Sequence, residues 1–132
     1  SSSEVTTGSK EKLWEDEKDS AILKNVDIAI KHINGPLFFG STDGFQKLAK
    51  TISKEASIVL FRFDRMEYID QSGLYALEDL LVDLSKQKKR IYFINLQNQP
   101  RYMFERVRLI PRLVSEHNVF DSIKDYINNT NK

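Results

Sequence analysis

The feature that most constrains the fold of this 132-residue chain is an alternation of short apolar runs with longer stretches of helical periodicity. Residues 57–63 and 91–96 are rich in apolar and β-branched side chains, and are short enough for strands buried on both faces. Between them an apolar stripe predicts a long helix that ends near the basic residues 86–90; its members are Leu74, Leu77, Leu80, Leu81 and Leu84. Strands that alternate with helices pair in parallel through crossover connections, so this pattern predicts an α/β fold.

The sequence of residues 26–52 predicts a β-hairpin followed by a helix. Residues 26–33 alternate apolar and polar side chains, as a half-buried strand does. Asn34-Gly35 is a strong tight-turn signal, and residues 37–39 then predict a second strand, antiparallel to the first. The first helix follows from the spacing of Phe45, Leu48, Ala49 and Ile52. We therefore expect a small mixed sheet with strand one antiparallel, the remaining strands parallel, and helices packed on the sheet.

The last third of the chain predicts two further helices. Pro100 suits the first turn of a helix that carries Phe104, and Pro111 interrupts the segment that follows. After Val119 and Phe120 a terminal helix is expected, with Ile123 and Tyr126 facing inward.

Composition limits the classes of function. The chain has 40% hydrophobic and 30% charged residues and a net charge of +1, so it is an ordinary globular sequence without the long-range field that nucleic acid would call for. Cysteine is absent, which excludes a disulfide scaffold, a thiolate metal site and a cysteine nucleophile. No apolar run approaches the ~20 residues of a membrane-spanning helix.

Residues 1–20 are rich in Ser, Thr and charge, and predict a flexible linker ahead of one domain over residues 21–132. Leu13 and Trp14 are apolar exceptions within this linker: they either dock back on the domain, which we favour, or form a contact surface for a missing partner. His32 and His117 are far apart and have no ligand-type neighbours at metal spacing, so each is expected at the surface or in a turn, with no metal bound.

Three stretches together resemble a STAS domain, the module shared by SulP-family anion transporters and bacterial anti-sigma-factor antagonists. They are Asn34-Gly35-Pro36-Leu37-Phe38-Phe39-Gly40, residues 66–80 around Asp70-Gln71-Ser72-Gly73, and Asn118-Val119-Phe120. The resemblance covers roughly residues 25–128 and is stronger toward the transporter branch. It implies a STAS fold and a cytoplasmic regulatory domain, not an enzyme, that affects transport, assembly or partner binding of a sulfate-like anion carrier.

The resemblance also implies partners and a place in the cell. These are the membrane domain of the chain's own transporter, which would be homodimeric, a cytosolic regulatory protein, and a position at the cytoplasmic face of the membrane. The alternative is a free-standing anti-sigma-factor antagonist that is switched by phosphorylation, since in that branch the serine matching Ser72 is phosphorylated.

Asp70-Gln71-Ser72-Gly73 is expected where a strand ends and a helix begins, with Ser72 as the helix N-cap. The exposed N–H groups of such a helix end also accept phosphate, so two interpretations stay open: Ser72 as a capping residue, which we favour, and Ser72 as a phosphorylation site. Asp70 would repel a phosphate there unless a cation intervenes.

The turns that follow the second and third predicted strands should emerge at one edge of the sheet, where α/β proteins bind ligands. The expected partner or anion surface comprises Phe39, Ser41, Thr42, Asp70, Ser72 and Gly73. Neither turn is a glycine-rich phosphate loop, so strong nucleotide binding is not indicated and no cofactor is expected. The basic and aromatic residues 101–108 are expected on an amphipathic helix, with the arginines in solvent and no nucleic acid bound.

Overall fold

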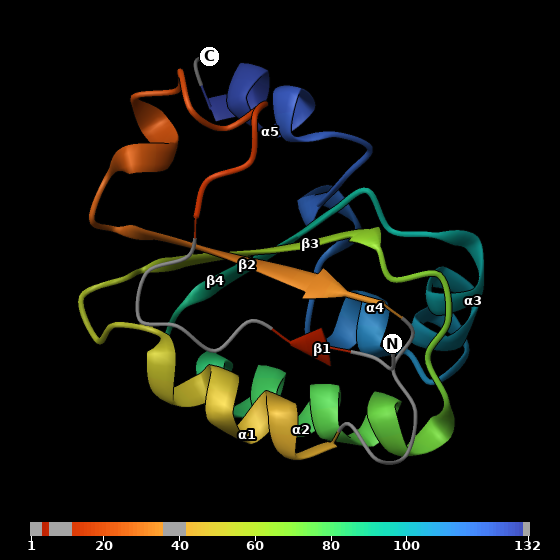
Figure 1. Cartoon of the computed structure of the whole chain (residues 1–132). Helices are drawn as coiled ribbons and strands as arrows, with labels where there is room; N and C mark the ends of the chain where they lie inside the picture. The colour runs from red at the N-terminus through yellow and green to blue at the C-terminus, as the bar shows by residue number, and fades with distance from the viewer. Residues whose placement is uncertain (1–3, 6–11, 36–41, 131–132) are drawn as a thin grey trace.

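A computed structural model describes residues 4–5, 12–35 and 42–130, and these build a five-stranded sheet with helices on both faces (Figure 1). The strands follow the order β1-β2-β3-β4-β5 across the sheet. Their bounds are β1 Glu4–Val5, β2 Ile28–Asn34, β3 Ile58–Arg65, β4 Arg90–Ile94 and β5 Val119–Phe120. The helices are η1 Ile22–Lys24, α1 Thr42–Thr51, α2 Gln71–Lys86, α3 Asn98–Arg106, α4 Leu109–Arg112, η3 Glu116–Asn118 and α5 Ile123–Thr130.

The strand predicted at residues 26–33 runs in the opposite sense to our expectation. β2 pairs in parallel with β3, as β3 does with β4 and β4 with β5. Its antiparallel neighbour is β1, which aligns Val5 with Ile33 and was not predicted. The expected partner strand at residues 37–39 lies outside the described residues.

The physical reason for this correction is the helix between the two strands. The chain leaves β2, forms α1 and returns as β3, which is a crossover connection and therefore places the strands parallel. Gly35 does adopt the turn conformation, with φ of 69°, but its N–H donates to the carbonyl of Arg65 at 2.7 Å, so the turn closes against β3.

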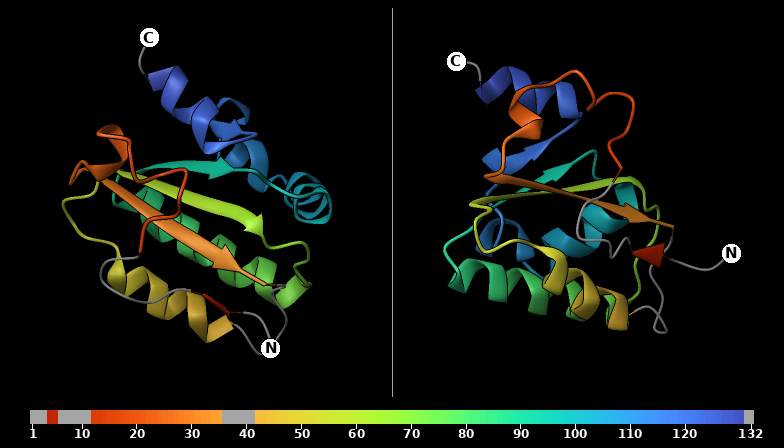
Figure 2. Two further views of the ribbon diagram at one scale, coloured as in Figure 1. Left: turned by 45° about the horizontal axis from the view of Figure 1, so that its top comes forward. Right: turned by 60° about the vertical axis from the view of Figure 1, so that its left-hand side comes forward.

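Alternation along the strands divides the core between two layers. Helices α1 and α2 lie side by side under one face, and η1 and α5 lie on the other (Figure 2). The face under α1 and α2 carries the larger cluster, in which Phe63 packs edge-to-face on Phe93 at a centroid distance of 4.9 Å. The opposite face carries a smaller cluster made by Leu23, Ile30, Leu60, Ile94, Ile123 and Tyr126.

Helix α2 is built as its leucine stripe predicts. All five leucines of the stripe are buried, and the helix ends at Lys86 beside the basic run. Lys88 then adopts a positive φ of 66° and its N–H donates to the carbonyl of Ser85 at 2.9 Å. Pro100 lies in the first turn of α3, and Ile123 and Tyr126 of α5 are buried, as expected.

The burial of β3 can be tested by making the same substitution at a buried and at an exposed valine. Val59 of β3 is 0% exposed and Val26 is 67% exposed. We expect Val59→Ala to lower the free energy of unfolding by about 2 kcal/mol, because it removes buried methyl groups and leaves a cavity. Val26→Ala should change it by less than about 0.5 kcal/mol. Urea unfolding of both variants measures the difference, and equal losses would contradict the burial of β3.

Candidate functional site

The Asp70-Gln71-Ser72-Gly73 segment is the junction between β3 and α2, as predicted. Asp70 has an extended backbone (φ −89°, ψ 178°) and its Oδ1 accepts a hydrogen bond of 2.8 Å from the Gly73 N–H. Its carbonyl accepts the first helical bond, from the N–H of Leu74 at 2.9 Å. Asp70 is therefore the N-cap of α2, and the prediction that Ser72 occupies this position is wrong.

The correction has a physical reason. Both side chains can cap a helix, but Asp70 also brings a full negative charge to the positive end of the helix dipole. With Asp70 as the cap, Ser72 becomes the second residue of α2 and is half-buried. It lies at the lining of a groove between α1 and α2, which Tyr75, Asp79 and Asp83 also line. The Ser72 side chain is thus not needed to start the helix.

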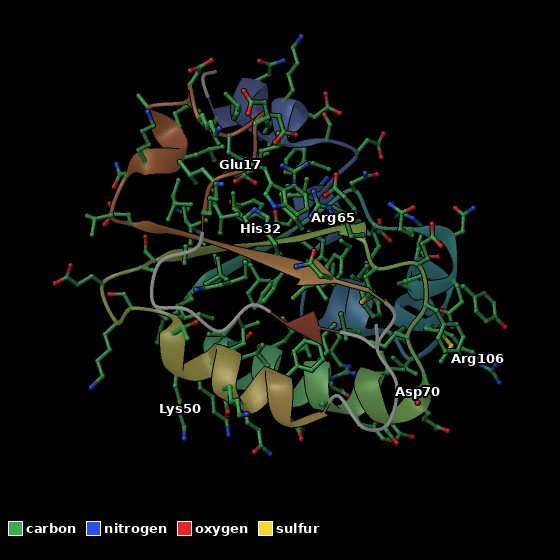
Figure 3. All side chains as sticks on the ribbon, viewed as in Figure 1. Glu17, His32, Lys50, Arg65, Asp70 and Arg106 are labelled. Carbon is green, nitrogen blue, oxygen red and sulfur yellow. The ribbon has the colours of Figure 1, made fainter. Side chains whose placement is uncertain are left out.

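A second contact fixes the junction from the side of α3. The side chain of Gln99 donates to the carbonyl of Ile69 and accepts from its N–H, both at 2.9 Å. A carboxamide can do both because it carries a donor and an acceptor side by side. The contact ties the residue before Asp70 to the first turn of α3, and no pattern in the sequence marks Gln99 for this role. Figure 3 shows Asp70 at the end of α2 that lies near α3.

Only part of the predicted surface can be placed. Asp70, Ser72 and Gly73 lie together, and Gly73 is buried with its N–H in the cap. Thr42 is the first residue of α1, but its side chain is not among those described. Phe39 and Ser41 lie outside the described residues. The shared surface, and the phosphorylation of Ser72, therefore stay predictions.

A buried charge cluster on the other face of the sheet was missed by the sequence interpretation. The guanidinium of Arg62 on β3 is bonded by three carboxylates, those of Asp16, Glu17 and Asp64. Its Nε donates to Asp64 Oδ1 at 3.0 Å and its Nη2 to Asp64 Oδ2 at 2.9 Å and Asp16 Oδ2 at 3.0 Å. Its Nη1 donates to Asp16 Oδ1 at 2.6 Å and Glu17 Oε2 at 3.0 Å. All five N–H donors of the guanidinium are thereby satisfied.

His32 completes this cluster from β2. It is 3% exposed, so the prediction of a surface or turn histidine is wrong for His32, whereas His117 is exposed in η3. The Nε2 of His32 lies 2.8 Å from Glu17 Oε2, and because an ionised carboxylate only accepts, Nε2 carries the proton. Glu17 is 0% exposed and also accepts from the N–H of Trp14 at 2.8 Å.

The ring of Trp14 covers the cluster. It stacks on His32 at a centroid distance of 4.2 Å, and the guanidinium carbons of Arg62 and Arg65 lie 4.6 Å and 4.2 Å from its centroid. Leu13 packs beside it on the smaller core. The prediction that Leu13 and Trp14 dock on the domain is confirmed. Figure 3 shows Glu17, His32 and Arg65 on this face of the sheet.

Hydrogen bonds within the cluster favour the ionised forms of Glu17, Asp16 and Arg62. Burial alone would raise the pKa of Glu17, but the hydrogen bonds from His32, the Trp14 N–H and Arg62 outweigh it and leave that pKa below its usual value. The pKa of Asp16 is also lowered, chiefly by the hydrogen bond from Arg62. The pKa of Arg62 is raised despite its burial, by its bonds to Asp16, Asp64 and Glu17.

One sequence signal could have located this cluster. Arg62 and Asp64 stand two residues apart, and Arg62 lies inside the apolar run 58–63, where a charge requires a partner. The residues that the structure describes include no group of three or more His, Asp or Glu side chains placed to hold a metal ion. Among the same residues, no helix is long and apolar enough to cross a membrane.

Comparison with known proteins identifies the family. The model of the STAS domain family matches residues 20–126, and the chain therefore belongs to that family. A relative, "Putative sulfate transporter YvdB" of Bacillus subtilis (strain 168), is 23% identical over 91 residues. The match covers 68% of this chain and only 17% of YvdB, so the chain corresponds to a small part of that protein.

Two solved structures share the fold. A sulfate transporter family protein from Wolinella succinogenes superposes with a TM-score of 0.71 at 24% identity, over 88% of this chain and 96% of that one. The unphosphorylated anti-sigma factor antagonist SpoIIAA superposes with a TM-score of 0.63 at 16% identity, over 81% of this chain and 90% of that one. At these identities the two likenesses establish the STAS fold, and they include both branches of the family.

The cap at Asp70 can be tested against Ser72. We expect Asp70→Ala to lower the free energy of unfolding by about 1 kcal/mol, because it removes the acceptor for the Gly73 N–H and the charge at the helix end. Ser72→Ala should cost less than half as much, since Asp70 still caps the helix. Chemical denaturation of the two variants decides which residue is the cap, and a larger loss in Ser72→Ala would reverse the assignment.

The charge cluster makes stability depend on pH in a defined direction. Glu17 has a lowered pKa in the folded chain, so its contribution is fully present above its ordinary pKa of about 4.5 and is lost as the pH falls through the lowered value. We expect wild type to be more stable than Glu17→Gln at pH 7, and the difference to shrink steadily between about pH 5 and pH 3. Denaturant unfolding at a series of pH values measures both curves. A difference that is constant over this range would contradict the ionised Glu17.

Proposed function

We propose that this chain is the cytoplasmic regulatory domain of a SulP-type secondary anion transporter and that it acts by binding, without a catalytic step of its own. The carrying observation is the junction in which Asp70 alone caps α2 and the Ser72 hydroxyl beside it is left free of that structural task. A docking surface needs polar side chains that the fold holds in position but that do not themselves stabilise the fold.

The transporter branch is supported by the relatives. The relative in Bacillus subtilis is named as a sulfate transporter, and the match to a small part of its length fits one domain of a larger carrier. The Wolinella succinogenes protein of the sulfate transporter family superposes with a higher TM-score than SpoIIAA does. We propose the membrane domain of the same transporter as the first partner, in a homodimeric parent, and a cytosolic regulatory protein as a second.

Anti-sigma-factor antagonist function, with Ser72 as its phosphorylated switch, is the second candidate. The likeness to SpoIIAA favours it. A phosphate on Ser72 would bring up to two further negative charges beside the Asp70 carboxylate at the positive end of α2, so this switch requires a cation or a basic side chain between the two groups. The two candidates differ in the complete protein, since only the transporter contains membrane-spanning segments outside this domain.

A pair of serine substitutions tests the docking surface. Ser72 lies at the carboxyl edge of the sheet, and Ser57 is exposed at its amino edge, immediately before β3. We expect Ser72→Asp to lower sulfate uptake by the complete protein in liposomes by about tenfold, and to weaken binding of the separate domain to the purified membrane domain. A charge added to a packed interface loses its hydration, and a tenfold loss corresponds to about 1.4 kcal/mol. Ser57→Asp is the matched control and should leave both unchanged.

The uptake of labelled sulfate and the recovery of the domain with purified membrane domain are the two measurements. Equal behaviour of Ser72→Asp, Ser57→Asp and wild type in both would remove the proposed surface. A complete protein without membrane-spanning segments would instead favour the antagonist function.

A further inference from the structure

Among the residues that the structure describes, side chains alone hold residues 12–20 on the sheet. Within the described residues, the backbone hydrogen bonds of this segment stay inside it: Glu17 N–H to the carbonyl of Trp14 at 2.9 Å, and Ser20 N–H to the carbonyl of Glu17 at 3.3 Å. No regular helix or strand begins before η1 in this part of the chain. The segment lies over the face of the sheet opposite α1 and α2 (Figure 2).

The contacts that hold it are concentrated at one point. Glu17 is fully buried between His32 of β2 and Arg62 of β3, and Asp16 bonds the same guanidinium through both of its oxygens. Leu13 and Trp14 are both half-buried and add apolar contact at the same place, with the Trp14 ring stacked on His32. We call Glu17, His32 and Arg62 the charge lock.

A buried ion network of this kind holds its segment with a small net free energy. The attraction between the charges is largely offset by the loss of their hydration, whereas the removal of one partner leaves the others buried without compensation. The sheet itself is held by the larger apolar cluster, which does not include the segment. Opening the segment and unfolding the sheet are therefore separate events with different energetic origins.

We propose that residues 12–20 form a strap that opens as a unit while the sheet stays folded, and that the charge lock holds it closed. The open form exposes the ring of Trp14 and uncovers His32 and Arg62, so that two cationic or polar groups replace a satisfied cluster on that face. This inference does not depend on the proposed function, because it concerns a contact within the chain.

The groups that face Glu17 set the conditions for opening. They are Asp16 of the strap itself, His32 of β2 and Arg62 of β3; Asp64 faces the same guanidinium, and Arg65 lies on the Trp14 ring. At neutral pH the carboxylates are ionised and the lock is closed. Protonation of Glu17 or Asp16 removes an acceptor charge from Arg62 and favours the open strap.

Native-state hydrogen exchange on the whole chain tests the strap directly. The reporters are the amides of Trp14, Glu17 and Ser20, whose acceptors all lie within the strap, so they exchange when the opened strap loses its turns. The amide of Phe61 in β3 reports unfolding of the sheet. In wild type we expect the three strap amides to exchange together, and faster than Phe61, with little dependence on low denaturant concentrations. Exchange of all four amides at the same rate would overturn the proposal.

A variant of the lock gives the second measurement. Glu17→Gln leaves Arg62 buried with one charge partner fewer, and we expect it to speed exchange of the strap amides on the order of 100-fold. Because unfolding of the sheet also opens the strap, exchange of Phe61 speeds by no more than the same factor and stays the slowest of the four. Asp19→Asn is the matched control, since Asp19 is an exposed carboxylate in the same segment, and it should leave the rates unchanged. Trp14 is the single tryptophan, so quenching of its fluorescence by acrylamide should rise in Glu17→Gln only.

Two results would contradict the charge lock. Strap amides that keep wild-type exchange rates in Glu17→Gln would show that other contacts hold the segment. Loss of the far-ultraviolet circular dichroism of the whole domain in Glu17→Gln, together with uniform exchange in wild type, would show that strap and sheet form one cooperative unit.

Discussion

The structure depends on the burial of β3 on both of its faces. This strand pairs with β2 on one side and β4 on the other, and five consecutive residues of it are buried. Val59, Phe61 and Phe63 reach the core under α1 and α2, whereas Leu60 and Arg62 reach the opposite face. Because side chains alternate along a strand, a single run of residues supplies both layers with their central contacts.

The same strand connects the two places where charge is important. At the opposite face it carries Arg62 and Asp64, and its last residue, Arg65, contacts the Trp14 ring. Five residues later the chain reaches Asp70, whose carboxylate caps α2. The candidate surface and the charge lock are therefore attached to one rigid element, and the clamp from Gln99 to Ile69 limits how far the intervening residues can move.

Local pattern predicted α2, the parallel pairing of β3 and β4 and the junction at Asp70, because each depends on residues close in sequence. The direction of β2 was wrong, because Asn34-Gly35 specifies a turn but not the strand against which the turn closes. The choice between Asp70 and Ser72 as N-cap was also beyond the pattern, since both residue types cap helices and their positions differ by two residues. The surface residues Phe39, Ser41 and Thr42 remain predictions.

The charge lock shows a different limit. A strand reading Phe61-Arg62-Phe63-Asp64 indicates a buried charge that needs partners, but it does not say where in the chain they are. Asp64 supplies one of them locally, which leaves three of the five guanidinium donors to be bonded by something else. Residues 12–20 supply two of these carboxylates and the Trp14 ring. Because the segment is rich in charged residues, its composition predicted a linker instead. Composition reports how the segment would behave in isolation, where it would be disordered. Its place in the fold is set by the N–H donors of Arg62 that Asp64 leaves without an acceptor.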